Sequence, residues 1–356
     1  MVSIESLRVH AIAHTFPEPT TLRRAIARLG FVQADPIRSP ARAQDLILRQ
    51  RVRTYQAGDL ERRYASLGIE EDGLYAYGFV PRRVWELIHP RNTAELSAIE
   101  KKVFAAVRRS GEIHPRELEA HLGRERVINA WGGYSKATTH ALDSLHWRGL
   151  LRITRRDNGI RVYDLAVPPA ELLPPEERLR QLILINARIL APVPEQTLHA
   201  NIAKLRRLGN TRATFADLVR TGELLKETVD GLSYVWPAGR MPKPEVPRTV
   251  RFLAPFDPLV WDRRRFEHLW GWAYRFEAYT PVAKRVRGYY AMPLLWCDKV
   301  IGWANASVAL GRLTVDIGFV GNRPREKDFR LELDAEIARL ESFLLRDTTP
   351  AIPLQD

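Results

Sequence analysis

The stretch that decides the fold is residues 135–165, SKATTHALDSLHWRGLLRITRRDNGIRVYDL. Its first half carries apolar residues at helical spacing, and we expect Ser135 to cap this helix. Two short apolar runs, 151–154 and 160–165, flank Asp157-Asn158-Gly159, a sequence that favours the turn of a β-hairpin. The stretch therefore predicts a helix followed at once by two antiparallel strands.

Two further helices are predicted just before this stretch. Residues 96–107 and 115–122 carry apolar side chains at helical spacing, and Pro115 suits a first helical position. Three helices followed by a two-stranded wing are typical of the winged-helix form of the helix-turn-helix. The same order is expected again downstream, with helices at 179–190, 198–205 and 215–219 and strands at 224–229 and 232–236.

The beginning of the chain predicts another module. Apolar spacing indicates helices over residues 3–15, 22–29 and 41–51, with an extended segment at 31–36. Gly30 is expected to end the second helix, and Arg42, Asp45 and Arg49 share one face of the third, where Asp45 can pair with both arginines. Residues 70–72 are interpreted as a solvated acidic turn and 75–79 as an aromatic strand or wing.

The pattern changes after a proline-rich linker at 237–247. Strands rich in aromatic and β-branched residues are predicted at 274–279, 288–297, 300–308 and 312–319. They indicate a small barrel or curled sheet, and a final amphipathic helix over 329–344 is expected to brace it. The predicted fold class is α+β, with tandem winged-helix modules followed by a small C-terminal β-barrel. The expected modules are 1–93, 94–168 and 169–240, and the barrel is 241–356.

Composition points to a polyanionic partner. The 356 residues carry a formal net charge of +13 and a pI near 10.0, mostly through arginine, the side chain best suited to bidentate phosphate contact. Double-stranded DNA is the expected partner. A membrane is not, because no run approaches the roughly 18 apolar residues of a spanning helix. The single cysteine, Cys297, excludes an intrachain disulfide and favours a reducing, cytoplasmic location.

Cations cluster in each predicted module, where we expect them to lie near phosphates. They are Arg38, Arg42 and Arg49 in the first module, Lys136, Arg155, Arg156 and Arg161 in the second, and Arg263, Arg264, Lys284 and Arg285 in the C-terminal part. For the arginines after Asp262, the alternative is that they reach solvent or a carboxylate such as Glu267. For the helix that begins near Lys136, an ordinary solvated helix is as consistent with the sequence as a base-reading one.

One polar pair stands out in an apolar context, in Phe31-Val32-Gln33-Ala34-Asp35-Pro36. In an extended segment Gln33 and Asp35 share one face, roughly 6–7 Å apart. An amide beside a carboxylate can orient water and face developing positive charge. The alternative is a strand end at which Asp35 caps a turn.

Several catalytic signatures are missing from the sequence. It contains no Walker-type phosphate loop, no His-Glu-x-x-His or Cys/His cluster, and no Gly-x-Ser-x-Gly elbow. The nine histidines are scattered. We therefore expect no metal site and no cofactor.

Longer runs around the polar pair resemble the winged-helix DNA glycosylases of the AlkZ/YcaQ type. One is residues 29–35, continuing into 39–46; others are 255–263, Tyr279-Thr280-Pro281, and Lys284-Arg285 with Gly288-Tyr289-Tyr290. Gln33-Ala34-Asp35 is similar to the aspartate version of the family's catalytic motif. One stretch departs from the pattern, because Tyr75-Ala76-Tyr77-Gly78-Phe79 stands where many relatives carry a Trp-Ala-His-Glu-Ala-like sequence.

The resemblance implies excision of N-alkylated purines, including N7-alkylguanine and interstrand crosslinks, by a monofunctional glycosylase. It implies that Gln33 and Asp35 are catalytic, with Asp35 as electrostatic stabiliser or general base and Gln33 orienting water. It also implies a monomer acting at the bacterial nucleoid. The alternative from another class is a non-enzymatic winged-helix regulator or architectural factor, for which every basic feature serves equally well.

Overall fold

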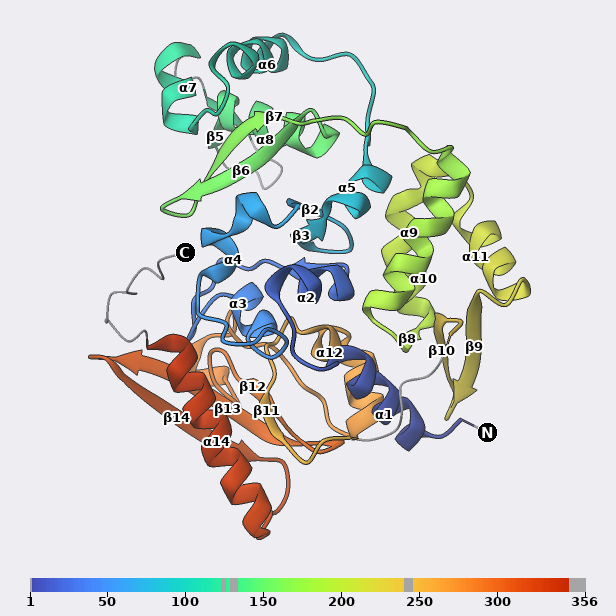
Figure 1. Cartoon of the computed structure of the whole chain (residues 1–356), viewed down its shortest axis with the longest axis vertical. Helices are drawn as coiled ribbons and strands as arrows, with labels where there is room; N and C mark the ends of the chain where they lie inside the picture. Colours follow the sequence, from blue (N-terminus) through green and yellow to red (C-terminus); the bar gives the residue numbers. More distant parts are fainter. Residues whose placement is uncertain (1, 123–125, 129–133, 240–245, 346–356) are drawn as a thin grey trace, which may run out of the picture. The chain divides into compact units, whose positions relative to one another are not determined.

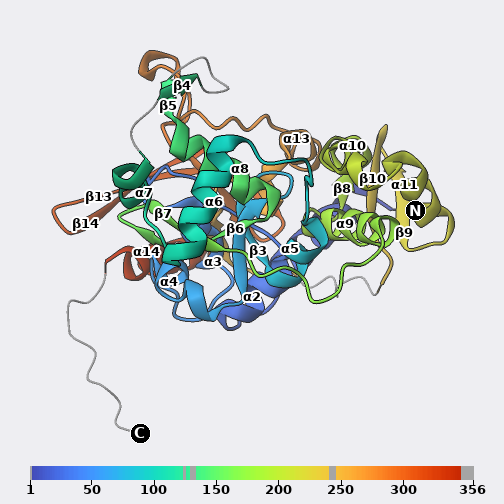
Figure 2. The ribbon, with the colours of Figure 1, turned by 90° about the horizontal axis from the view of Figure 1, so that it is seen from above.

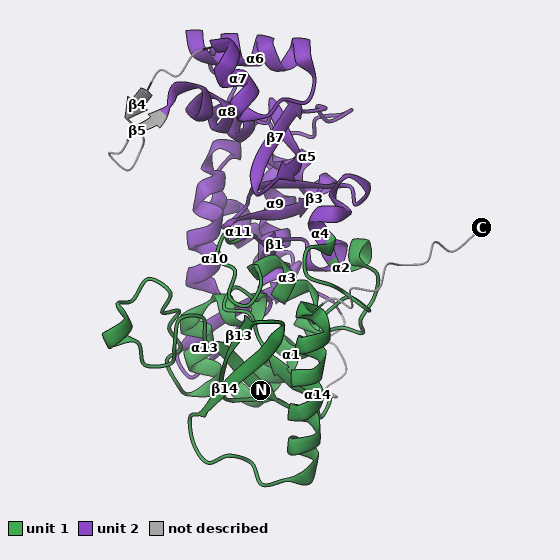
Figure 3. Ribbon diagram, turned by 90° about the vertical axis from the view of Figure 1, so that its left-hand side faces the viewer, with its two compact units in different colours: residues 1–25, 35–59, 241–356 green, residues 26–34, 60–240 purple. Residues whose placement is uncertain are grey.

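The computed structural model describes residues 2–122, 126–128, 134–239 and 246–345, and within them the fold is mixed α+β, as predicted. The chain forms two compact units, which Figure 3 colours separately. Unit 1 comprises residues 1–25, 35–59 and 241–356, and unit 2 comprises 26–34 and 60–240. Each unit is thus built from segments far apart in the sequence. No helix in the described ranges is long and apolar enough to cross a membrane.

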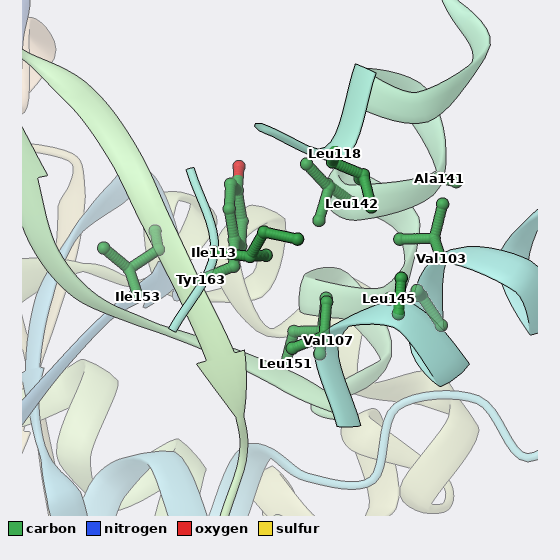
Figure 4. Packing of buried hydrophobic residues seen from close by; sticks show 11 residues of the cluster. Val103, Val107, Ile113, Leu118, Ala141, Leu142, Leu145, Leu151, Ile153 and Tyr163 are labelled. Carbon is green, nitrogen blue, oxygen red and sulfur yellow. The ribbon is translucent and has the colours of Figure 1, made fainter. Parts of the chain in front are cut away.

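The stretch 135–165 folds as expected in unit 2. Helices α6 (Ala98–Ser110), α7 (Pro115–Leu122) and α8 (Ala137–Arg148) precede the hairpin of β6 (Leu151–Asp157) and β7 (Ile160–Leu165). Asn158 and Gly159 turn the hairpin with φ of 49° and 85°, the left-handed values that this pair of residues favours. Figure 4 shows the shared core, in which Val107, Leu145 and Tyr163 are buried together.

The start of α8 differs from the prediction. Lys136, rather than Ser135, is the N-cap, and it makes no side-chain capping bond. Ser135 instead lies in strand β5 (Tyr134–Lys136), which pairs with β4 (Arg126–Ile128). Pairing with β4 keeps this segment extended up to the first helical residue, so the strand ladder prevails over the local capping signal.

The same order recurs later in unit 2, as predicted. Helices α9 (Pro175–Ile189), α10 (Glu195–Ile202) and α11 (Thr211–Arg220) are followed by the hairpin of β9 (Leu224–Val229) and β10 (Leu232–Pro237). Asp230 and Gly231 form its turn with φ of 46° and 80°. A short strand, β8 (Val193–Pro194), adds to the other edge of β10, and Figure 2 shows the helices gathered beside this sheet.

A second three-stranded sheet in unit 2 has the order β1-β3-β2, from β1 (Val32–Gln33), β3 (Tyr77–Pro81) and β2 (Ile69–Gly73). The interpretation of 70–72 as a solvated turn is wrong, since Glu70, Glu71 and Asp72 are buried in β2. Burial is tolerated because each carboxylate has cationic partners: Arg82 and Arg152 bind Glu70, Arg156 binds Glu71, and Arg91 binds Asp72. Helix α5 (Arg82–Ile88) follows β3.

Unit 1 begins with α1 (Ile4–Thr15) and contains α3 (Ala43–Leu48), which is shorter than the predicted helix at 41–51. Helix α2 (Leu22–Leu29) spans the boundary between the units and ends at Gly30, whose φ is +71°. Helix α4 (Asp59–Arg62) also begins in unit 1 and continues into unit 2.

The C-terminal part of unit 1 is a curled four-stranded sheet with the order β11-β12-β13-β14 (Figure 1). Its strands are β11 (Val250–Phe252), β12 (Met292–Trp296), β13 (Lys299–Ala309) and β14 (Arg312–Phe319). The strand predicted at 274–279 does not form, because β11 takes the place beside β12. The predicted final helix is α14 (Lys327–Leu344), whose Phe329 packs on Trp296 and Phe319 of the sheet.

Two short helices, α12 (Pro258–Trp261) and α13 (Arg263–Trp270), precede β12 in unit 1. The segment between α13 and β12 contains one short 3₁₀ turn, Val282–Lys284.

Candidate active site

Gln33 lies at the end of β1, directly opposite Gly78 of β3. Its side chain is half-buried, and its Oε1 atom is fully buried without a hydrogen-bond partner. A buried amide oxygen normally finds a donor, so an unpaired one in a native fold calls for an explanation. A water or a substrate group that donates to Oε1 would supply it.

Gly78 allows β1 to approach β3 this closely. A Cβ atom on Gly78 would lie 2.2 Å from the Val32 carbonyl oxygen and 2.9 Å from the Gln33 Cα. Both are backbone atoms that cannot swing aside. Glycine at this position therefore sets where Gln33 stands.

The stretch 75–79 holds the segment that carries Gln33 in place. The Ala34 N–H donates to the Tyr77 carbonyl at 3.0 Å, and the ring of Tyr75 packs on Phe31 with centroids 4.7 Å apart. The Tyr77 hydroxyl donates to Glu71 at 3.0 Å. These contacts give Tyr75 and Tyr77 clear structural roles beside the Gln33 segment.

Asp35 lies outside the strand and caps its own turn. Its Oδ1 accepts the Ile37 N–H at 2.9 Å, so the expected strand with Gln33 and Asp35 on one face ends at Gln33, and the turn alternative describes Asp35 correctly. The carboxylate is half-buried. Burial raises its pKa above the usual value, and the Ile37 hydrogen bond partly opposes this shift. Gln33 belongs to unit 2 and Asp35 to unit 1.

Tyr290 of unit 1 is buried, and the charge of Asp35 acts on its phenol. Its side chain is 2% exposed, and burial followed by the negative charge of Asp35 raises the pKa of its phenol well above the usual value. The tyrosine comes directly after Tyr289 and just before β12. Its sequence context, Gly288-Tyr289-Tyr290, assigns it no role on its own.

The cations near α3 turn inward. The Arg49 side chain is 4% exposed, and its Nη2 atom binds Glu336 of α14 at 2.6 Å. Asp45 accepts hydrogen bonds from the Tyr55 hydroxyl at 2.7 Å and from the Gly58 N–H at 3.0 Å. The expected role of Arg49 as the partner of Asp45 on an open basic face therefore gives way to a buried contact with α14. Arg42 is half-buried, and Arg38 is exposed.

Arg51 binds the run 255–258 of the C-terminal part. It forms a bidentate ion pair with the buried carboxylate of Asp257, with distances of 2.8 and 2.9 Å, and its guanidinium stacks on the ring of Phe16. Asp257 also caps α12 by accepting the Leu259 N–H. The run 255–258 thus anchors the N-terminal segment of unit 1 to its C-terminal part.

The cations of the wing are largely paired within the protein. Arg156 is bound to Glu71 at 2.6 Å, and Arg161 to Asp143 at 3.1 Å while lying over the ring of Tyr77. Arg155 is about half exposed, beside Glu112 and Asp157. Lys136 is also about half exposed and binds Glu119 at 2.6 Å. Of these four, Arg155 and Lys136 are the ones that face solvent.

Asp262 caps α13, since it accepts the Arg265 N–H at 2.9 Å. The nearby guanidinium of Arg263 binds the carbonyls of Val260 and Pro255 and lies over the ring of Tyr274. Arg265 is buried and donates to the Pro258 carbonyl. Backbone carbonyls thus accept hydrogen bonds from both of these arginines, and Arg264 is exposed.

The segment before Tyr290 presents cations beside exposed apolar side chains. Lys284 is exposed, and Arg285 donates to the Thr280 carbonyl and lies over the ring of Tyr289. Tyr279 and Val282 are 80% and 76% exposed. We call residues 279–286 the exposed basic loop.

In the described residues, no group of three or more His, Cys, Asp or Glu side chains is arranged to hold a metal ion. In unit 1 the Asp35 carboxylate can accept hydrogen bonds and face positive charge, and in unit 2 the Gln33 amide oxygen can accept a hydrogen bond.

A comparison with protein families matches the chain over residues 26–343 to the model described as AlkZ-like, DNA glycosylase AlkZ-like. The match covers most of the chain and includes Gln33, Asp35 and the exposed basic loop. No solved structure matches the chain.

Proposed function

The chain belongs to the AlkZ-like DNA glycosylase family, and from this premise we propose that it excises N-alkylated purines from double-stranded DNA. The proposed substrates are N7-alkylguanine and interstrand crosslinks formed through it, and the product is an abasic site. The observation that carries the proposal is the half-buried carboxylate of Asp35, with its raised pKa, joined through Ala34 to Gln33 with its unpaired amide oxygen.

The proposed reaction needs only two contributions from the protein. An N7-alkylated guanine is cationic and leaves readily, so the enzyme must stabilise a sugar that becomes positively charged and must position water. The Asp35 carboxylate supplies the negative charge and accepts the proton of the attacking water, and Gln33 orients that water. Partial burial strengthens the interaction of Asp35 with the developing cation, because the local dielectric is lower than in water. This hydrolysis needs no covalent enzyme intermediate, so we propose a monofunctional glycosylase.

We propose that two winged-helix modules of unit 2 help to hold the duplex. Support comes from the repeated order of three helices and a hairpin, in α6 to β7 and in α9 to β10. The proposed phosphate contacts are limited to the exposed cations Arg38, Lys136, Arg155, Arg264 and Lys284, with Arg285 at the edge of the exposed basic loop. Arg42, Arg49, Arg156, Arg161 and Arg263 are half-buried or turned toward protein groups, and we assign Arg49, Arg156 and Arg263 structural roles.

The test is base release from a duplex that carries a single N7-methylguanine, read out as an abasic site after alkaline cleavage. The wild-type chain is expected to release the base, and Asp35→Asn is expected to lose this activity while binding the duplex as before. Asp316→Asn is the matched control, since it removes one exposed carboxylate from the same unit and should leave release unchanged. Binding by the wild-type chain without release of any alkylated purine would favour the non-enzymatic alternative and refute the proposal.

A further inference from the structure

A cavity of about 430 Å³ lies within unit 2, lined by the end of α2 and by α5 and α9. Helix α5 packs beside α9 (Figure 1), and Arg178 of α9 donates to the Leu87 carbonyl of α5 at 2.9 Å. Arg83 of α5 in turn donates to the Ala27 carbonyl of α2 at 3.3 Å. The cavity is thus enclosed by helices that are hydrogen-bonded to one another, and its volume is within the roughly 300–1,000 Å³ of sites that hold small molecules.

One part of the lining is apolar. Leu29 of α2 and Val84 and Leu87 of α5 contribute to it, and Leu184 and Ile185 of α9 complete it. Leu184 and Ile185 are only half-buried, so part of their apolar surface is uncovered. An apolar group placed against them would remove that surface from water, which is favourable.

The charged part of the lining is mainly basic. The arginines are Arg28, Arg83, Arg178 and Arg188, and the carboxylates are those of Glu86 and Glu171. Glu86 already binds Arg82, which lies outside the lining, at 3.1 Å. The lining therefore carries an excess of positive charge, which favours an anionic ligand.

Arg178 is the buried member of this set, with 4% of its surface exposed, and its Nη2 atom is buried without a hydrogen-bond partner. Arg91 of the same unit shows the usual outcome, since its similarly buried side chain binds the carboxylate of Asp72 at 2.6 Å. Burial lowers the pKa of the Arg178 guanidinium, and no carboxylate of the described residues opposes this shift. A buried cation without a counter-charge costs stability, and this points to an anion that arrives as a ligand.

We propose that this cavity binds a small organic acid, whose ionised head group pairs with Arg178 and whose apolar body lies against Leu184 and Ile185. The guanidinium has five N–H donors, and its bond to the Leu87 carbonyl uses only one of them. An ionised acid group accepts more than one such bond and supplies the missing negative charge. The site is separate from the proposed base excision, because Gln33 is not among the lining residues.

The probe is 8-anilinonaphthalene-1-sulfonate, which joins a sulfonate to an aromatic body and fluoresces when it is bound to apolar surface. Its dissociation constant is measured by fluorescence titration of the full chain, and the uncharged N-phenyl-1-naphthylamine is titrated for comparison. The wild-type chain should bind the sulfonate saturably, and Arg178→Met should bind it at least about tenfold more weakly, since a charge-assisted contact is lost. The uncharged probe should bind the wild-type chain at least about tenfold more weakly than the sulfonate does, and Arg178→Met should leave its binding unchanged.

Arg180→Met is the matched control, because this arginine of α9 binds Asp217 and Glu223 and does not line the cavity. It should keep the dissociation constant of the sulfonate within about twofold of the wild-type value. Leu184→Trp should abolish binding of both probes, because the larger side chain fills the cavity, so the test does not depend on Arg178→Met alone. Three results would each overturn the inference: no saturable binding by the wild-type chain, equal affinity in Arg178→Met, or an uncharged probe that binds as tightly as the sulfonate.

Discussion

Replacing Gly78 by alanine is expected to slow base release far more than it destabilises the fold. The added Cβ would stand 2.2 Å from the Val32 carbonyl oxygen and 2.9 Å from the Gln33 Cα. Carbon and oxygen normally approach to about 3.3 Å, so β1 must retreat by roughly 1 Å. Overpacking of this kind costs about 1–3 kcal/mol, whereas a 1 Å displacement of a reactant-positioning group costs about 100-fold in rate.

The assay is single-turnover release of N7-methylguanine, with the free energy of unfolding measured in parallel by urea titration. Gly68→Ala is the matched control, because Gly68 has a φ of +66° in open space before β2 and alanine there costs about 1–2 kcal/mol of backbone strain. The control should lose stability and keep its rate. If Gly78→Ala releases the base within twofold of the wild-type rate, Gln33 does not depend on this close approach and the reasoning is refuted.

Three further predictions follow from buried and exposed charges. Arg51→Met should destabilise the protein by about 3–5 kcal/mol, since the carboxylate of Asp257 would remain buried without its partner. In urea titration, the double variant with Arg51→Met and Asp257→Leu should recover part of the lost unfolding free energy. No recovery in the double variant would contradict this explanation. Burial alone would raise the pKa of Asp72, but the His89 hydrogen bond and the charge of Arg91 lower it to about 2. The lowered pKa contributes about 2 kcal/mol to the unfolding free energy above pH 4, and this contribution is lost as the pH falls toward 2. Asp72→Asn should therefore flatten the acid dependence of the unfolding free energy. Lys284→Ala should reduce by about 1 the slope of log binding constant against log salt concentration for any duplex, and an unchanged slope would remove the exposed basic loop from the phosphate contacts.

Local signals in the sequence were sufficient for the hairpins and most helices. Asp157-Asn158-Gly159 and Asp230-Gly231 mark their turns because asparagine, aspartate and glycine accept left-handed backbone, and this property belongs to the residues themselves. The repeated order of three helices and a hairpin was predicted from such signals together with apolar spacing.

Long-range pairing decided the features that were predicted wrongly. Glu70-Glu71-Asp72 has the composition of a solvated turn, yet arginines from as far as residue 156 make its burial possible. The strand expected at 274–279 has a suitable composition, but β11, which lies just after the predicted linker, pairs with β12 instead. No local pattern could identify either partner.

The candidate site was partly predictable in the same sense. Gln33 and Asp35 could be found because polar side chains stand in an apolar segment. The role of Gly78 depends on its pairing with Gln33 of another strand, so it emerges only in three dimensions. The cationic residues could be identified from the sequence, but it does not reveal which of them face solvent. Arg49, for example, faces Glu336 because α14 packs beside it.

The most direct test of the central claim is the single-turnover rate constant for N7-methylguanine release by the wild-type chain and by Asp35→Asn, measured at saturating protein so that every duplex is bound. If Asp35 stabilises the developing cation and accepts the proton of water, the wild-type chain releases the base, and the asparagine variant is slower by at least about 100-fold at equal duplex occupancy. Equal rate constants for the two proteins would contradict the account.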